Sequence, residues 1–173
     1  MLNEKIVNAL NKQINEELFS AYLYMSMSSY CSSVGLEGFA HWMNIQQQEE
    51  LFHSTKLYNY VINRGGRAIL ETIVKPQSEW KEAVDIIEAA KKHEHHITGC
   101  INSLITLSLE ENDHATASFL KWFIDEQVEE EANVEAVLNK FKLTKNDSTA
   151  LFIIDKELST RVLNLPVDPN AKA

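Results

Sequence analysis

Acidic and amide side chains interrupt four stretches whose apolar residues recur every three or four positions, the spacing of a helix face that packs into a core. The interruptions are Glu17, Gln46, Glu50, His53, Glu94, Gln127 and Glu130. Each lies near the middle of its stretch, so helices packed side by side with matched ends would bring them to one level. Since unpaired charge is costly in a core, such acids must be protonated, solvated or bound to a cation.

The spacing of these residues suits a metal ion. Glu50 and His53 are three positions apart, close to one helical turn, so both side chains can reach one ion. Gln127 and Glu130 have the same spacing. Carboxylates with one imidazole form an oxygen-rich set that is typical of iron or manganese sites. Carboxylates placed to bridge from two helices indicate two metals about 3.5–4 Å apart.

The alternatives are a solvated acidic helix face and a purely structural polar network. A solvated face explains Glu131 and Glu135. It does not explain Glu17 or Glu94, because each is a single acid with apolar neighbours one turn away on both sides. The sequence therefore predicts a buried metal centre.

The interruptions also repeat along the chain. Adding 77 to a residue number converts Glu17 to Glu94, Glu50 to Gln127, His53 to Glu130 and Glu49 to Glu126. Chance could produce one such pair, but four pairs at one offset indicate a duplicated helical hairpin. Its pseudo-twofold axis would pass through the polar residues.

The elements that must position these side chains follow from the same periodicity. Helices are predicted over about 4–33, 37–64, 79–110 and 114–142, with a short fifth helix over about 148–158. The connection 65–78 is long enough to cross the length of a bundle. We therefore expect one all-α domain over 1–173: a four-helix bundle over about 4–142 with one long crossover, the fifth helix, and a polar tail over 159–173.

Composition narrows the function classes. The chain has 173 residues and a formal net charge of −9, so nucleic acid and anionic membranes are poor partners. No apolar run reaches the length of a membrane span, and the N-terminal residues show no export signal. Cys31 and Cys100 match no paired motif and predict buried free thiols in a reducing compartment. We expect a cytoplasmic protein.

The chain resembles bacterial non-haem ferritins over nearly its whole length. The resemblance rests on NEELFSAYLY (15–24), QEELFH (48–53), FLKWFIDEQVEEE (119–131) and FIIDKELST (152–160). Ferritin-like di-iron bundles place one Glu on each of two helices and Glu-x-x-His on each of the other two. Here Glu17 and Glu94 match the single acids, but Gln127 and Glu130 replace the second Glu-x-x-His, as in ferritins. Leu51 stands where haem-binding bacterioferritins have methionine, so the resemblance implies no haem.

The resemblance also assigns roles by position. Glu17, Glu50 and His53 would bind one iron, and Glu50, Glu94 and Glu130 the second, with Glu50 bridging. Gln127 would hydrogen-bond to bound dioxygen or water, and Tyr24 would be a redox-active tyrosine. A third iron site would use Glu49, Glu126, Glu129 and Glu130; the alternative is a solvated acidic patch lining a cavity.

Four aromatic or imidazole positions remain open. Trp122 matches the family, but an aromatic residue at that spacing is more often part of the core. His93, His95 and His96 flank Glu94 off its apolar stripe, and exposed helix histidines explain them as well as transient cation contacts do.

The function implied is iron storage: a ferroxidase oxidises Fe(II) with dioxygen or peroxide and keeps ferric oxyhydroxide inside a hollow shell of 24 copies. One alternative is a di-iron peroxidase or oxygenase on the same bundle, although the chain lacks the CxxC-type iron site of rubrerythrin-like relatives. Another is a DNA-protecting mini-ferritin, although those chains place ligands between subunits and lack the fifth helix.

Overall fold

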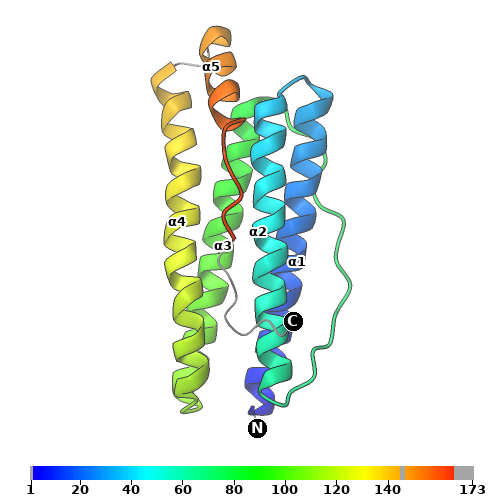
Figure 1. Cartoon of the computed structure of the whole chain (residues 1–173), viewed down its shortest axis with the longest axis vertical. Coiled ribbons are helices and arrows are strands. Elements are labelled where there is room, and N and C mark those ends of the chain that lie inside the picture. Colours follow the sequence, from blue (N-terminus) through cyan, green and yellow to red (C-terminus); the bar gives the residue numbers. More distant parts are fainter. Residues whose placement is uncertain (1, 145–146, 166–173) are drawn as a thin grey trace.

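The computed structural model describes residues 2–144 and 147–165, which form five helices and no strand. The helices are α1 (Glu4–Ser33), α2 (Glu37–Asn63), α3 (Ala83–Glu110), α4 (His114–Thr144) and α5 (Ser148–Leu158). Four long helices lie side by side, and α5 packs at one end (Figure 1). The predicted all-α bundle with a short fifth helix is confirmed.

The connection between α2 and α3 runs along the outside of α1, from one end of the bundle to the other (Figure 1). Gly65 begins it with a φ of 76°, a left-handed conformation that favours glycine. Side chains of α1 then hold it: Asn11 donates to the carbonyl of Arg67 (3.2 Å), and Ser26 donates to that of Gln77 (2.8 Å). The crossover therefore fastens the two helical hairpins together.

The start of α3 differs from the prediction, which placed it near residue 79. Trp80 is buried, and the hydroxyl of Tyr30 on α1 donates to its carbonyl, so this residue is held in the connection. Helix α3 begins after Glu82, whose backbone N–H donates to the Asp85 carboxylate at 3.0 Å. A tertiary contact followed by this capping bond therefore sets the boundary.

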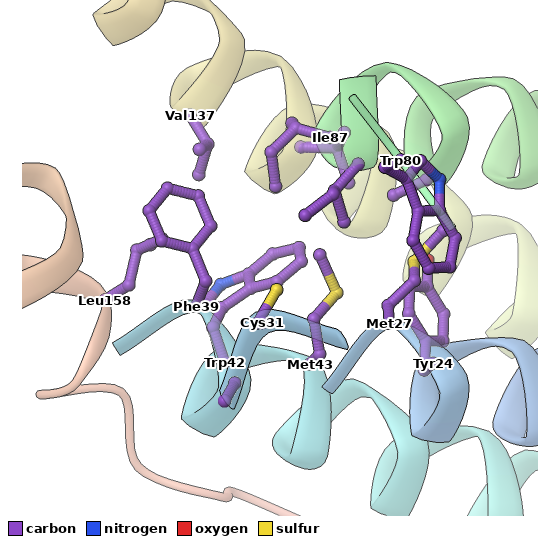
Figure 2. Packing of buried hydrophobic residues seen from close by; sticks show 14 of the residues in the cluster. Tyr24, Met27, Cys31, Phe39, Trp42, Met43, Trp80, Ile87, Val137 and Leu158 are labelled. Atoms are coloured by element: carbon purple, nitrogen blue, oxygen red, sulfur yellow. The ribbon is translucent and has the colours of Figure 1, made fainter. Parts of the chain in front are cut away.

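Two apolar clusters fill the bundle, one on each side of the polar residues. The cluster near α5 includes Met27, Phe39, Met43, Ile87 and Val134, and Figure 2 shows its side chains pointing toward one another. The cluster at the other end includes Leu10, Leu57, Ile97 and Phe123. Along each long helix the polar residues stand between members of the two clusters. We call this set the polar layer: Glu17, Gln46, Glu50, His53, Glu94, Gln127 and Glu130.

Helix α5 is fixed against the start of α2. The Asp155 carboxylate accepts the backbone N–H of Phe39 at 3.0 Å, which satisfies a free donor at the N-terminus of α2. Gly38 makes this approach possible, since a Cβ there would lie 1.7 Å from the Asp155 carbonyl oxygen. Ile154 and Leu158 are buried, whereas Phe152 and Ile153 are 69% and 61% exposed.

None of the helices in the described ranges has a stretch long and apolar enough to cross a membrane. Both cysteines are free thiols. Cys31 is buried as predicted, but the prediction was wrong for Cys100, which is only half-buried. Cys100 lies at the surface beside His96, with 3.6 Å between Sγ and Nε2.

Candidate metal centre

Helices α1 and α2 bring three predicted ligands together. One ligand atom from each of Glu17, Glu50 and His53 lies within 4.8 Å of the other two. The three side chains are 1%, 1% and 3% exposed. Nδ1 of His53 lies 3.2 Å from Oε2 of Glu50, the neighbour one turn away. The spacing read from the sequence therefore produces a compact set of buried donors.

Helices α3 and α4 supply the opposing half of the polar layer. Glu94, Gln127 and Glu130 are buried, and Nε2 of Gln127 donates to Oε2 of Glu94 at 3.1 Å. The Tyr24 hydroxyl donates to the other oxygen of Glu94. Nε2 of Gln46 on α2 donates to Oε2 of Glu130 at 2.7 Å. The acids of this half are thus oriented by donors from three helices.

Burial and like charge keep protons on these acids. The pKa of Glu17 is raised to about 8, first because burial penalises the carboxylate and second because Glu50 is close. The pKa of Glu94 is raised to about 8 by burial and by the charge of Glu130. Glu50 faces Glu94 and Glu130, and its pKa also lies well above the usual range. Protons held by Glu17, Glu50 and Glu94 therefore reduce the negative charge of the metal-free core.

The donor set suits iron. Oε2 of Glu17 is buried and accepts no hydrogen bond from the described residues, whereas Oε1 accepts one from Gln13 at 3.0 Å. A buried oxygen without a donor is costly unless a cation or proton satisfies it. Carboxylate oxygens with one imidazole match the preferences of iron and manganese.

A third acidic set lies beside the polar layer. Glu49, Glu126 and Glu129 line a cavity of about 350 Å³ together with His53 and Glu130. Burial raises the pKa of Glu49 to about 7, although the guanidinium of Arg161 lowers it, and burial also raises the pKa of Glu126. The structure thus places all four residues of the predicted third site on one cavity, which also touches both halves of the polar layer.

Aromatic side chains surround the imidazole of His53. Trp122, Phe123 and Phe52 contact it edge-on, with ring centroids 5.4, 6.0 and 6.4 Å away. Trp122 is itself half-buried, with the Lys56 ammonium 4.3 Å from its ring centroid. These contacts restrict the rotation of the imidazole, so that its Nδ1 stays directed toward Glu50.

The three histidines of α3 do not share one environment. The interpretation of His93 as an exposed helix histidine was wrong, because its side chain is only 8% exposed. Its Nε2 lies 2.7 Å from the Ser20 hydroxyl oxygen. Burial lowers the pKa of His93 to about 4, so it is neutral. His95 pairs with Glu131 (3.1 Å) and His96 with Glu16 (3.0 Å), and both side chains are more than half exposed.

Three residues of the site were not singled out as site residues from the sequence. Gln13 precedes Glu17 by four residues and donates to it, so the i, i+4 spacing was a usable signal. Gln46 interrupts the apolar stripe of its helix, but it donates to Glu130 on α4, a contact between helices that spacing does not predict. Arg161 contacts both Gln46 and Glu49 from the segment after α5, and no helical periodicity or repeat points to it.

Comparisons with known proteins agree with this architecture. A family model described as a ferritin-like domain matches residues 7–144. The bacterial non-heme ferritin of Staphylococcus aureus (strain MRSA252) is 38% identical over 164 residues, which cover 95% of this chain and 99% of that protein. That of Staphylococcus saprophyticus is 38% identical over 161 residues, or 93% of this chain and 96% of that protein.

Solved structures show the same similarity. An open pore ferritin from the hyperthermophilic archaeon Archaeoglobus fulgidus superposes with a TM-score of 0.92 at 46% identity, covering 94% of this chain and all of that one. A closed form of that ferritin, engineered by site-directed mutagenesis, gives 0.93 at 45% identity and covers 95% of this chain and all of that one.

Proposed function

The chain belongs to the ferritin family, and we propose that it oxidises Fe(II) at the polar layer of its own four-helix bundle. It is an iron-storage ferritin and a ferroxidase. The observation that supports this location is the approach of Glu17, Glu50 and His53 to within 4.8 Å inside the core.

We assign the first iron to Glu17, Glu50 and His53. We assign the second to Glu50, Glu94 and Glu130, with Glu50 bridging. The supporting arrangement is the pseudo-twofold placement of single acids on α1 and α3 and of paired ligands on α2 and α4. A buried bridging carboxylate between two metals also explains why Glu50 has acids on both sides.

The substrates are Fe(II) and dioxygen. Two Fe(II) ions each give one electron, and anionic carboxylates favour the Fe(III) product because attraction grows with the charge of the ion. Glu17 and Glu94, with pKa values near 8, release protons as Fe(II) enters. Gln127, whose amide donates to Glu94, would donate a hydrogen bond to bound dioxygen or water. Tyr24 contacts Glu94 through its hydroxyl and is the nearest candidate for a redox-active residue.

We propose Glu49, Glu126, Glu129 and Glu130 as a third iron site on the way to stored mineral. The cavity that they line and the presence of Glu130 in both sets support a direct transfer. The centre would use iron without haem, since Leu51 offers no sulfur ligand beside Glu50. We propose that the protein acts in the cytoplasm.

Storage requires an enclosed space, and we propose assembly into a shell of 24 copies. The exposed apolar side chains of Phe152 and Ile153 on α5 support burial of this helix between subunits. Size-exclusion chromatography tests the assembly, which should elute near 24 times the 19.7 kDa chain mass.

Stopped-flow oxidation of Fe(II) in air tests the site. Glu50→Ala combined with His53→Ala removes the bridging acid and the imidazole, and the fast phase should slow by at least about 100-fold. Glu88→Ala, which removes an exposed acid of α3 outside the polar layer, is the matched control and should keep the fast phase. An unchanged fast phase in the double variant, with normal assembly, would show that oxidation occurs elsewhere.

A further inference from the structure

The segment after α5 places a positive charge on the third acidic set. Residues 159–165 turn back along the bundle beside α2 (Figure 1). Nη2 of Arg161 lies 2.8 Å from Oε2 of Glu49, and the two side chains are only 19% and 15% exposed. Glu49, which we assigned to an iron site from the sequence, is therefore already paired with a positively charged side chain.

Arg161 is held in place by contacts besides this ion pair. Its carbonyl oxygen lies 2.8 Å from Nε2 of His41, and its guanidinium lies over the Trp42 ring, 5.1 Å from the centroid. An arginine fixed at its backbone and stacked on an aromatic ring keeps its donors aimed in one direction. Here they point at the cavity wall formed by α2.

The same guanidinium reaches the ferroxidase ligands through one amide. Nη1 of Arg161 donates to Oε1 of Gln46, and Nε2 of Gln46 donates to Oε2 of Glu130 at 2.7 Å. The first bond fixes which end of the amide faces Glu130. Arg161 thus touches Glu49 directly and orients, through Gln46, the acid that belongs to both proposed iron sets.

We propose that Arg161 is a charge gate on the third acidic set: its guanidinium takes the place of a cation at Glu49, and iron reaches this set only when Arg161 releases it. This inference rests on the proposed function and adds a residue that regulates movement of iron out of the di-iron centre. A cation that binds beside Glu49 must displace the guanidinium of Arg161 and is then repelled by this nearby positive charge. The intact ion pair therefore weakens cation binding at Glu49.

A merely structural role for Arg161 makes a different prediction. If the residue only fastened the C-terminal segment, its removal would lower stability and leave metal affinity in the cavity unchanged or weaker. Lys140 provides a matched control, because it ties α4 to Glu157 of α5 through an ion pair away from the cavity. Lys140→Gln removes an ion pair that also connects the C-terminal part of the chain to the bundle, and it does not change the charge beside Glu49.

Anaerobic calorimetric titration with Fe(II) alone tests the gate. In Arg161→Gln, the third binding event per subunit should be about 10-fold tighter than in the unmodified protein. The first event should keep its affinity, because among the described residues Arg161 contacts none of the ligands Glu17, Glu50 and His53. Lys140→Gln and Arg161→Lys, which keep the cavity charge, should leave the third event unchanged. Adding Glu49→Gln to Arg161→Gln should remove the gain.

Two outcomes would overturn the gate: an unchanged or weaker third event in Arg161→Gln with intact assembly, or an equal gain in Lys140→Gln. If Arg161→Gln fails to assemble, Arg161→Met, which also removes the charge and keeps the apolar part of the side chain, is titrated instead, and the third event should again be about 10-fold tighter. An unchanged or weaker third event in that variant would also contradict the proposal. Failure of the proposed function looks different, since the first two events would then survive Glu50→Ala with His53→Ala.

Discussion

The two helical hairpins place acids at equivalent positions, but they prepare them differently. In the α1–α2 hairpin, Glu17 accepts a hydrogen bond from Gln13, and its second oxygen has no donor among the described residues. In the α3–α4 hairpin, Glu94 accepts hydrogen bonds on both oxygens, from Tyr24 and Gln127. The sequence repeat is therefore preserved in position and broken in hydrogen bonding.

This difference indicates an order of filling. When a cation displaces the proton near an oxygen that has no donor, no hydrogen bond accepted by that oxygen is lost, and the oxygen is stabilised when the cation arrives. An oxygen with a donor is well oriented but must share its lone pairs. We expect the α1–α2 half to bind its iron first and more tightly, and the α3–α4 half to bind second.

Removing the single acid of each hairpin should have unequal effects on binding. Glu17→Gln should weaken the first Fe(II) binding event by about 100-fold or more, because a first ligand is lost from the half that has a free oxygen. Glu94→Gln should leave the first event within about threefold and weaken the second. Anaerobic titration of the two variants with Fe(II) measures both events.

Gln is chosen because it keeps the volume and half of the acceptor capacity of Glu. Circular dichroism and size-exclusion chromatography confirm that each variant folds and assembles. Equal losses in the two variants would mean that the hydrogen-bond asymmetry does not order the binding.

The pH dependence of binding follows from the raised pKa values. Near pH 7 the metal-free forms of Glu17 and Glu94 hold protons that Fe(II) must expel, so affinity should rise by up to about 10-fold per pH unit for each proton and level off above pH 8. Titration in buffers of different ionisation enthalpy counts the protons released. Proton release that does not change between pH 6 and 8.5 would contradict the assignment.

Stability of the metal-free protein should change in the opposite direction. The folded pKa of these acids, about 8, exceeds the ordinary value of 4.5, so the folded state binds more protons between these limits. The stability that this provides is complete below pH 4.5 and is lost as pH rises toward 8. The thermal midpoint of chelator-treated protein should fall over this window, and bound Fe(II) should reduce the fall.

Periodicity and the repeat of 77 predicted most of the architecture. They located the four long helices and the polar layer, because a helix with one buried face shows its burial as a 3.6-residue pattern. The predicted start of α3 was wrong, because Trp80 is held in the connection by Tyr30 of another helix. The predicted exposure of His93 was also wrong because of a contact between helices: its imidazole, which lies off the apolar stripe, packs beside the small Ser20 of α1.

The site was predictable to the extent that its residues lie on helical faces. Glu50 and His53 come together as their spacing requires, and the packing of α1 on α2 adds Glu17. Arg161 could not be found in this way, because it follows α5 and reaches Glu49 through a tertiary turn that leaves no periodic signal. Contacts between separate elements determine such residues, and local sequence patterns do not.

The smallest predicted effect concerns the donor that Tyr24 supplies across the hairpins. Tyr24→Phe removes the hydroxyl that donates to Glu94 and leaves the ring in its apolar cluster. The second Fe(II) event should weaken by about 10-fold, because the loss of the orientation that the hydroxyl gives Glu94 outweighs the lone pair that it frees, while the first stays unchanged. Anaerobic titration measures the two events, and rapid-freeze spectroscopy during oxidation tests whether Tyr24 is also oxidised. Met27→Leu, a volume-conserving change one turn away in the same cluster, is the control for packing. If Tyr24→Phe weakened the first event instead, the hydrogen bond would not act on the α3–α4 half, and the two hairpins would have to be treated as one coupled site.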